Sequence, residues 1–461
     1  MENLLTTVTK ADLAAAVTDE RGVKYSPDGL RLLKAPSYEL SGNYAIKPGT
    51  KIICNGAFRG CTVTGITIPD SVSSIGAGAF MRCSSLSSII IPDSVTAIGG
   101  YAFRMCRSLK NVNIHYGVKY IGCGAFEMCV SLTNIIIPDG VTSIDMRSFA
   151  ECRSLTSISI PDSVTSIEGW AFLGCQSLTS ISIPDGVTSI GDRAFECCTS
   201  LNSIEIPDSV TCISDRAFSM CNMPSITIPV SVKEMRGNPF NDWNGELINK
   251  SPYFTYEDGV LFSKNKDKII AFRRLDETSY IIPDSVVYIG DSVFLGCSSL
   301  NSVVIPDSVT SIGNNAFAVC KSLASIVIPN GVRHIGNSAF VGCSSLTSII
   351  IPDGVTSISD SAFSGCSSLT SIVIPDSVTS ISDSAFSGCS SLTNIVIPDA
   401  VTSIGFNAFN ECKLLTSIAI PDSVKFVGDG AFDLCDSLSK ATREEIEKRF
   451  GEDAFDSFVL F

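Results

Sequence analysis

Hydrophobic and polar positions recur along most of the chain with a period of 23 residues. Residues 352–374 read PDGVTSISDSAFSGCSSLTSIVI, and residues 375–397 read PDSVTSISDSAFSGCSSLTNIVI. A fixed period of this size indicates a solenoid, in which each unit stacks only on its neighbours. The repeated prolines that mark the units are Pro69, Pro92, Pro138, Pro161, Pro184 and Pro207, then Pro283, Pro306, Pro329, Pro352, Pro375, Pro398 and Pro421.

Each unit divides into a strand, a turn, a second extended piece and a compact segment. The Leu-x-x-Ile-x-Ile segment at 369–374 alternates at its end and predicts a strand. Pro375-Asp376-Ser377 predicts a turn, because proline fixes φ there. Val378 to Ile381 predicts a short extended piece, and Ala385 to Cys389 predicts a single helical turn.

A phenylalanine occupies the same position of every unit, which predicts 16 coils and roughly 75–80 Å of stacked strands at the usual spacing. An aromatic binding stripe is one interpretation. A buried stack is the other, and we favour it because every coil needs an inward anchor. The column is Phe58, Phe80, Phe103, Phe126, Phe149, Phe172, Phe195, Phe218, Phe240, Phe294, Phe317, Phe340, Phe363, Phe386, Phe409 and Phe432.

Fifteen of the 19 cysteines also share one position of the unit. A metal site needs ligands that converge on a point, whereas these residues are spread along the stack. The pattern favours a column of small buried thiols. Stacking at about 5 Å permits disulfides, but the odd count and the absence of a recognisable secretion signal favour reduced thiols. The column is Cys61, Cys83, Cys106, Cys129, Cys152, Cys175, Cys198, Cys221, Cys297, Cys320, Cys343, Cys366, Cys389, Cys412 and Cys435.

The two ends of the chain predict short helices that cover the stack. Residues 1–21 predict a helix with a Thr9–Asp12 capping box and a stop at Gly22. Near the other end, a box of Thr442 and Glu445 predicts a helix from Arg443 to Phe450, stopped by Gly451. The last aromatic and aliphatic residues are predicted to pack there too, namely Phe455, Phe458, Leu460 and Phe461.

Two segments outside the period predict β-hairpins, at 23–50 and 253–283. Trp243 occupies the cysteine position of the last coil before the second hairpin, where its larger side chain is predicted to close the thiol column. The predicted organisation is an N-terminal helix and hairpin (1–50), a first repeat block (51–243), a hairpin insertion (244–280), a second repeat block (281–440) and a C-terminal helical cap (441–461).

Composition narrows the classes of function. The formal net charge of −14 argues against a nucleic-acid or anionic-membrane binder. No run of 18 apolar residues occurs, so membrane insertion is not expected. Charged residues make up 17% and hydrophobic residues 45%, which suits a dry interior rather than disorder.

Candidate chemistry is sparse. The two histidines, His115 and His334, lie nearly ten coils apart, so no catalytic or metal triad can be assembled from them. An Asp that follows most of the repeated prolines, such as Asp353 and Asp376, could line a calcium-binding edge, but turn chemistry explains it better. We expect no enzyme activity, no metal and no cofactor.

One outward position of the strand differs between the two blocks. In the first block it is mixed, with Asn113, Ser159 and Glu205 among its residues, whereas in the second it is apolar. An exposed apolar ridge is a candidate partner site, although β-branched residues also stabilise a parallel sheet. The candidate partner-binding residues are Val304, Val327, Ile350, Val373 and Val396, together with Trp170, which is expected to be exposed before an Ala-Phe pair.

The unit Leu-x-x-Ile-x-Ile-Pro-Asp-x-Val-x-x-Ile-x-x-x-Ala-Phe-x-x-Cys resembles the BspA-like leucine-rich repeat family over about 51–438. The resemblance implies an α/β, β-rich, right-handed curved solenoid with the Leu-x-x-Ile-x-Ile strands on its concave face. It also implies a recognition or adhesion protein at the cell surface. We expect a monomer that binds a protein or glycan through the curved strand face. The absence of a signal peptide favours a cytoplasmic location instead, and with it the alternative function of an intracellular scaffold.

Overall fold

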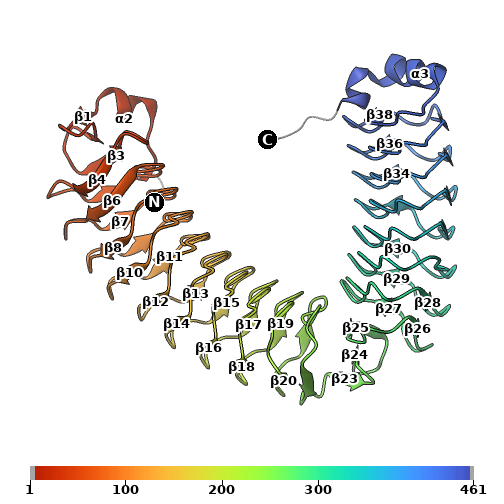
Figure 1. The fold of residues 1–461 in the computed structure, drawn as a ribbon, viewed down its shortest axis with the longest axis horizontal. Coiled ribbons are helices and arrows are strands. Elements are labelled where there is room, and N and C mark those ends of the chain that lie inside the picture. The colour runs from red at the N-terminus through yellow and green to blue at the C-terminus, as the bar shows by residue number, and fades with distance from the viewer. Residues whose placement is uncertain (1–5, 457–461) are drawn as a thin grey trace. The chain divides into compact units, whose positions relative to one another are not determined.

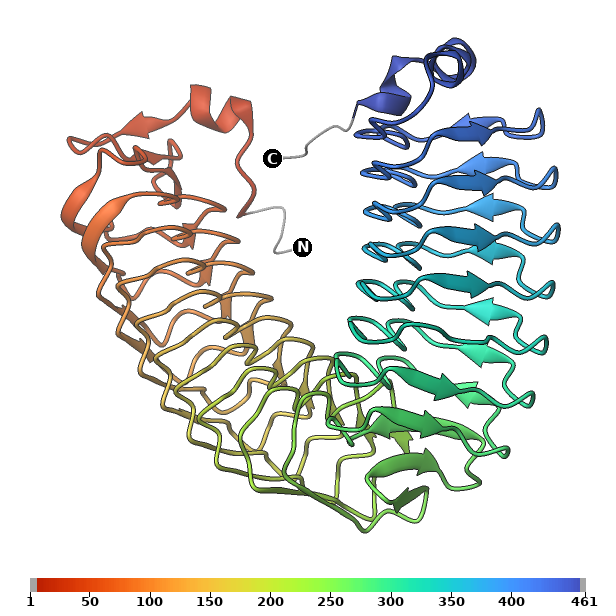
Figure 2. The same cartoon turned by 45° about the vertical axis from the view of Figure 1, so that its right-hand side comes forward.

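The computed structural model of the chain describes residues 6–456 and divides into two compact units. The first unit ends at Ser251, and the second begins at Pro252. Each unit is a stack of coils in which most coils contribute one longer and one shorter strand (Figures 1 and 2). The predicted repeat solenoid is therefore confirmed.

Parallel strands from neighbouring coils form two ladders in the first unit. The longer strands alternate, so that Ile89 and Ile91 are buried while Ile90 points outward. The longer strands are β4 (Ser41–Ala45), β6 (Thr62–Thr67), β8 (Ser88–Ile91), β10 (Asn111–Ile114), β12 (Asn134–Ile136), β14 (Ser157–Ser159), β16 (Ser180–Ser182), β18 (Ser203–Glu205), β20 (Ser225–Ile228) and β22 (Glu246–Asn249). The shorter strands are β5 (Ile52–Ile53), β7 (Ser74–Ile75), β9 (Ala97–Ile98), β11 (Tyr120–Ile121), β13 (Ser143–Ile144), β15 (Ser166–Ile167), β17 (Ser189–Ile190), β19 (Cys212–Ile213) and β21 (Glu234–Met235).

A short helix and a hairpin precede these ladders. Helix α2 (Lys10–Ala14) begins with the predicted capping box, in which the Thr9 side chain accepts the Asp12 N–H and the Asp12 carboxylate accepts the Thr9 N–H. The predicted stop at Gly22 is wrong, because the helix ends eight residues earlier and Gly22, at φ 79°, lies in the turn between two antiparallel strands. Those strands are β1 (Val17–Thr18) and β2 (Lys24–Tyr25), and β3 (Arg31–Lys34) follows them. Residues 1–5 of the predicted helix lie outside the described part of the chain.

The second unit begins with the predicted hairpin. Strands β23 (Phe254–Glu257) and β24 (Val260–Ser263) pair antiparallel around Asp258-Gly259, and β24 pairs antiparallel with β25 (Lys268–Phe272). Because β25 pairs parallel with β27 (Tyr288–Ile289), the first of the shorter strands, the hairpin continues the ladder of shorter strands. The others are β29 (Ser311–Ile312), β30 (His334–Ile335), β32 (Ser357–Ile358), β34 (Ser380–Ile381), β36 (Ser403–Ile404) and β38 (Phe426–Val427). The longer strands are β26 (Ser279–Ile281), β28 (Ser302–Val304), β31 (Ser348–Ile350), β33 (Ser371–Val373), β35 (Asn394–Val396) and β37 (Ser417–Ala419).

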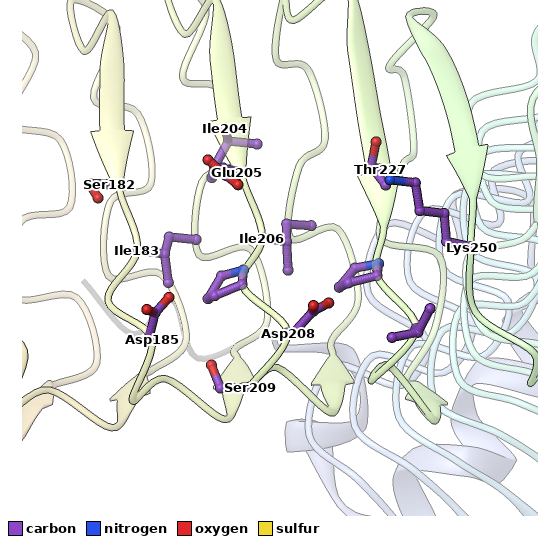
Figure 3. Close-up of a pocket in the computed structure, with 13 residues that line it drawn as sticks. Ser182, Ile183, Asp185, Ile204, Glu205, Ile206, Asp208, Ser209, Thr227 and Lys250 are labelled. Atoms are coloured by element: carbon purple, nitrogen blue, oxygen red, sulfur yellow. The ribbon is translucent and has the colours of Figure 1, made fainter.

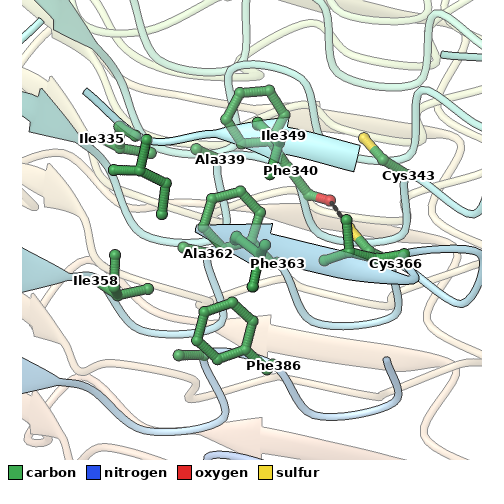
Figure 4. Close-up of a cluster of buried hydrophobic side chains, with 14 of the residues drawn as sticks. Ile335, Ala339, Phe340, Cys343, Ile349, Ile358, Ala362, Phe363, Cys366 and Phe386 are labelled. Carbon is green, nitrogen blue, oxygen red and sulfur yellow. Dashed lines mark hydrogen bonds between the residues drawn. The ribbon is translucent and has the colours of Figure 1, made fainter. Parts of the chain in front are cut away.

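The phenylalanine column forms the centre of the core in each unit. Figure 4 shows Phe340, Phe363 and Phe386 one above another between buried isoleucines. Ring centroids of Phe363 and Phe386 lie 5.6 Å apart with an interplanar angle of 7°. These rings are fully buried, so the prediction of a core stack rather than a binding stripe is confirmed.

The segment around each phenylalanine differs from the expected helical turn. Ser361 and Phe363 donate backbone N–H bonds to carbonyls of the next coil at 2.8 and 2.9 Å, whereas Ala362 and Ser364 donate to carbonyls three residues earlier in their own coil. Ser361 has φ of 53°, outside the right-handed helical region. Two tight turns, with backbone hydrogen bonds to the next coil, therefore replace the expected helical turn.

The two ladders of the first unit are unequal. The ladder of shorter strands is interrupted once, between β11 and β13, whereas the ladder of longer strands is interrupted twice, between β14 and β16 and between β18 and β20. In Figure 1 the coils of this unit fan apart on the side of the longer strands. Strands on the wider side of a curved stack separate first, so the concave placement that the resemblance implied is wrong for this unit.

A helix and a 3-10 turn follow the last coil of the second unit. Helix α3 (Lys440–Phe450) is capped by Ser439, whose hydroxyl accepts the Thr442 N–H at 3.2 Å, so the predicted cap at Thr442 is wrong by three residues. Gly451 ends the helix as predicted, at φ 95°. Within residues 6–456, no helix has the length and apolar character needed to span a bilayer.

The segment after α3 binds the last coil in the same way as a further coil would. In η1 (Glu452–Phe455), the carbonyls of Asp453 and Ala454 accept N–H groups of the last coil at 2.7 and 2.8 Å. The ring of Phe455 lies 6.0 Å from that of Phe432 and extends the column. The predicted packing of Phe455 is thus confirmed, while Phe458, Leu460 and Phe461 lie outside the described residues.

Candidate interaction surface

The second unit exposes a row of aliphatic side chains along its longer strands. Each lies between two buried isoleucine or valine positions, because successive side chains of a strand point to opposite faces. We call this row, together with Ile281 described next, the apolar ridge. The sequence-predicted members and their exposed fractions are Val304 (56%), Val327 (79%), Ile350 (70%), Val373 (64%) and Val396 (76%).

The ridge begins one coil earlier than the sequence analysis expected. Ile281 is 72% exposed and is the register partner of Val304 in the adjacent strand. The signal was present, since Ile281 precedes Ile282-Pro283 as Val373 precedes Ile374-Pro375. With Ile281 the ridge spans six consecutive coils, or roughly 24 Å at the usual strand spacing.

On one flank of the ridge, threonine hydroxyls are already hydrogen-bonded. The Thr370 hydroxyl donates to the Thr347 carbonyl at 3.2 Å, and the Thr416 hydroxyl donates to the Thr393 carbonyl at 3.1 Å. A partner that covers this flank does not strip unsatisfied hydroxyl groups of water. On the other flank lie the exposed turn carboxylates, such as Asp353 and Asp376.

The same column is discontinuous in the first unit. Ile90 and Ile136 are 61% and 68% exposed, but Asn113 separates them and polar residues follow. The two units therefore present longer-strand faces of different chemical character.

Where the longer strands of the first unit separate, an open groove of about 910 Å³ lies across β16, β18 and β20 (Figure 3). Asp185, Glu205 and Asp208 supply carboxylates to its lining, and Lys250 supplies the amine. The lining residues include neither histidine nor cysteine.

Trp170, the remaining sequence-predicted contact residue, is half-buried rather than fully exposed. Its ring lies between two guanidinium groups, with Arg147 at 5.3 Å and Arg193 at 5.8 Å from the centroid. Both arginines come from the neighbouring coils at the same position of the unit, which sequence spacing alone indicates once the 23-residue period is recognised.

The cysteine column is buried, as predicted, and its thiols donate along the stack. Cys366 Sγ lies 3.2 Å from the Phe340 carbonyl oxygen, which also accepts the Cys343 N–H (Figure 4). Burial raises the pKa of the Cys343 thiol to about 12. All 19 cysteines are free thiols, and Cys123, Cys197 and Cys212 lie outside the column and are only partly buried.

The other titratable groups do not gather into a metal centre. Within residues 6–456, no three His, Cys, Asp or Glu side chains are close enough together to hold a metal ion. His115 Nδ1 lies 3.4 Å from an Asp93 carboxylate oxygen in the first unit, and His334 is an exposed residue of β30 in the second.

Stacked coils, a parallel ladder and a buried Leu, Ile, Phe and Cys interior define a leucine-rich-repeat solenoid. The family described as BspA type leucine rich repeat region (6 copies) matches residues 42–142, 119–246, 269–393 and 379–460. The chain therefore belongs to the BspA-type leucine-rich repeat family, whose members are typically surface and protein-interaction proteins and generally not enzymes.

Two solved structures are similar over nearly the whole chain. A leucine rich cell surface protein from Faecalibacterium prausnitzii A2-165 is 28% identical, with 95% of this chain and 98% of that chain covered and a TM-score of 0.46. A leucine-rich repeat protein from Bacteroides ovatus ATCC 8483 is 30% identical, with 95% and 96% covered and a TM-score of 0.42. No curated protein matches this chain.

Proposed function

We propose that this protein is a non-catalytic recognition protein that binds a partner protein through the apolar ridge of its second unit. The observation that carries the proposal is the run of aliphatic side chains, each 56–79% exposed, on six consecutive coils. Contiguous apolar surface of this kind marks interaction sites in soluble proteins. The ridge is built of aliphatic side chains alone, which favours a protein partner over a glycan.

The competing explanation is that β-branched residues merely stabilise the parallel sheet. The two explanations differ in what they expect of the triple variant Val327→Asn, Val373→Asn and Val396→Asn. If the ridge is a docking surface, the variant folds but loses its partner. If the ridge only stabilises the sheet, the variant loses stability and keeps whatever partner it has.

A photo-crosslinking residue placed at Val373 in cells that produce the native protein tests this directly. We expect a crosslinked adduct of discrete mass, which disappears when Val327→Asn and Val396→Asn are added. The same residue placed at Thr356, exposed beside the shorter strand, is the matched control and should give no such adduct. An adduct that persists in the double variant, or none at either position, would contradict the proposal.

The proposal extends to an exposed position at the cell surface, in keeping with the typical location of the family. Protease shaving of intact cells tests this part separately. Loss of the native protein on shaving supports surface exposure and an adhesion role. A protected protein favours the alternative of a scaffold inside the cell, which leaves the ridge as its binding surface.

A further inference from the structure

A second surface stands apart from the apolar ridge, along the tight turns of the first unit. We define the turn edge as the positions from three before to two after each column phenylalanine, over the seven coils from Phe80 to Phe218. Its distinctive members are Met81, Arg82, Tyr101, Arg104, Met105, Met128, Met146, Arg147, Trp170, Arg193, Arg216 and Met220.

The second unit provides an internal comparison. Over its seven coils from Phe294 to Phe432, the same positions contain no arginine, lysine, methionine, tyrosine or tryptophan. They contain mostly Ser, Asn, Gly and Ala, with one exposed aromatic residue, Phe406. Both units have carboxylates at these positions, so the difference between them is in the basic and large side chains. The carboxylates are Glu127, Glu151, Asp192, Glu196 and Asp215 in the first unit and Asp291, Asp360, Asp383, Glu411, Asp429 and Asp433 in the second. The repeat scaffold therefore does not need the large side chains of the first unit. Arginine, methionine and aromatic residues are the types enriched at the centres of protein interfaces.

The backbone conformation makes these large residues costly. Tyr101, Arg147 and Trp170 have φ of 58°, 58° and 57°, in the left-handed region that bulky residues rarely adopt. The equivalent residues of the second unit, such as Ser361 and Asn407 at φ 53° and 54°, are small polar types. Strained residues that contribute little to the core point to a role other than folding.

Some arginines of the turn edge form ion pairs with buried carboxylates, and others form none within the described residues. Glu196, which is buried, pairs with both Arg193 and Arg216, and Arg104 lies 2.8 Å from the buried Glu127. By contrast, Arg82, Arg147 and the adjoining Arg107 form no ion pair with any residue of 6–456. Buried carboxylates thus hold Arg104, Arg193 and Arg216 in place. The guanidinium groups of Arg82, Arg107 and Arg147 have no carboxylate partner in the part of the chain that the structure describes, although that of Arg147 packs against the Trp170 ring.

We propose that the turn edge of the first unit binds an extended acidic segment of a partner protein. Partner carboxylates pair with Arg82, Arg107 and Arg147, and apolar side chains of the segment contact Met146 and the exposed part of Trp170. Four coil steps of about 5 Å separate Arg82 from Trp170, so the site accepts roughly six residues of extended chain. This surface, and therefore this proposal, is independent of the apolar ridge.

Fluorescence anisotropy of a labelled peptide with the sequence Asp-Asp-Leu repeated four times tests the proposal on the full chain. We expect saturable binding that Trp170→Asn and Arg147→Asn each weaken at least tenfold. Both substitutions introduce a residue that the second unit already uses at this position with positive φ, as at Asn315 and Asn407, so folding should persist. Thermal unfolding of each variant checks this.

The control variant is Arg333→Asn, which removes an exposed arginine of the second unit and should leave the peptide affinity unchanged. Lys-Lys-Leu and Asp-Asp-Ser repeats of equal length should bind at least tenfold more weakly. Equal affinity of the wild type and both turn-edge variants would overturn the proposal. So would equal binding of the basic peptide, or tighter turn-edge-dependent binding of a single-stranded oligonucleotide.

Discussion

Each phenylalanine of the column contributes through both its ring and its carbonyl group. The ring of Phe340 stacks on that of Phe363, while its carbonyl oxygen accepts the Cys343 N–H within the coil and the Cys366 thiol of the next. Offset aromatic stacking contributes about 0.5–1.5 kcal/mol beyond area burial. One residue therefore fixes the position of the next coil both through the core and through the backbone.

Replacing Phe363 by alanine tests how much this position contributes to the free energy of unfolding. We expect Phe363→Ala to lower the free energy of unfolding by about 3–5 kcal/mol, because it leaves a cavity in a fully buried stack. Urea denaturation provides the measurement. Phe406→Ala, at a side chain that is 45% exposed, is the control and should cost about 1 kcal/mol or less. A loss below that value at Phe363 would contradict the stacking role.

The buried thiols predict a loss of stability at alkaline pH. A column thiol such as Cys343 has its pKa raised by burial to about 12, from an ordinary value of 9.0. Between these values the unfolded chain loses the proton that the folded chain keeps, so each such thiol makes stability fall by about 1.4 kcal/mol per pH unit as pH rises. Below pH 9 the contribution is fully present.

Urea midpoints measured from pH 8 to pH 11 check the sign and the window. Cys343→Val should reduce the slope over that range without changing its sign, whatever it does to stability at pH 8. A stability that is constant to pH 11 would show that the thiols are not protonated and buried as described.

At the scale of the element, the hydrogen bonds at the two ends of the second unit differ from the parallel pairing inside the stack. Strand β25 belongs to an antiparallel hairpin on one side and to the parallel ladder on the other. Helix α3 is attached to the last coil by Arg449, whose guanidinium donates to the carbonyls of Ile420 and Pro421 at 2.5 and 2.9 Å.

The capping residue of α3 can be identified by substitution. We expect Ser439→Ala to destabilise the helix by about 1 kcal/mol, since its hydroxyl accepts the Thr442 N–H, one of the free N–H groups of the first turn. Hydrogen exchange of the α3 amides provides the readout. Glu445→Ala is the comparison, because a cap at Thr442 would make it the more damaging change. In this structure it should cost less than Ser439→Ala.

At the scale of the whole chain, stability is approximately a sum of contributions from neighbouring coils. The units at 352–374 and 375–397 differ at only two positions, so removal of one of them preserves every interface type. We expect a chain lacking residues 375–397 to fold and unfold cooperatively, with the apolar ridge one residue shorter. Circular dichroism on heating provides the measurement.

A deletion of half a unit is the control for this experiment. A chain lacking residues 375–385 places polar positions of the following strand in the core, and should lose cooperative unfolding in the second unit. Equal behaviour of the two deletions would contradict a solenoid in register.

The period of the sequence was sufficient to predict the coils, the phenylalanine stack and the outward direction of Val373. It was not sufficient at the ends, where Ser439 and Thr442 are both acceptable caps and only the packing of Ile446 against the core selects between them. The concave placement of the longer strands, which the family resemblance implied, was wrong for the first unit, since curvature depends on small differences in coil width that no single residue encodes.

The candidate sites were predictable in part. Alternation identified five members of the apolar ridge, but Ile281 was missed because its coil begins in a hairpin. Trp170 was singled out, yet its contacts with Arg147 and Arg193 lie between coils and become visible only when the units are stacked.

Asp453, Ala454 and Phe455 occupy the place of a further coil, and this bears on self-association of the protein. Parallel stacks are extendable in principle, because the last coil offers the same unpaired N–H groups that the preceding coils use to bind their successors. Here Gly430 and Phe432 already donate to η1, and α3 covers the adjoining face. These two donors are therefore occupied and cannot bind a further coil, which disfavours head-to-tail growth of a highly repetitive sequence at this end of the stack.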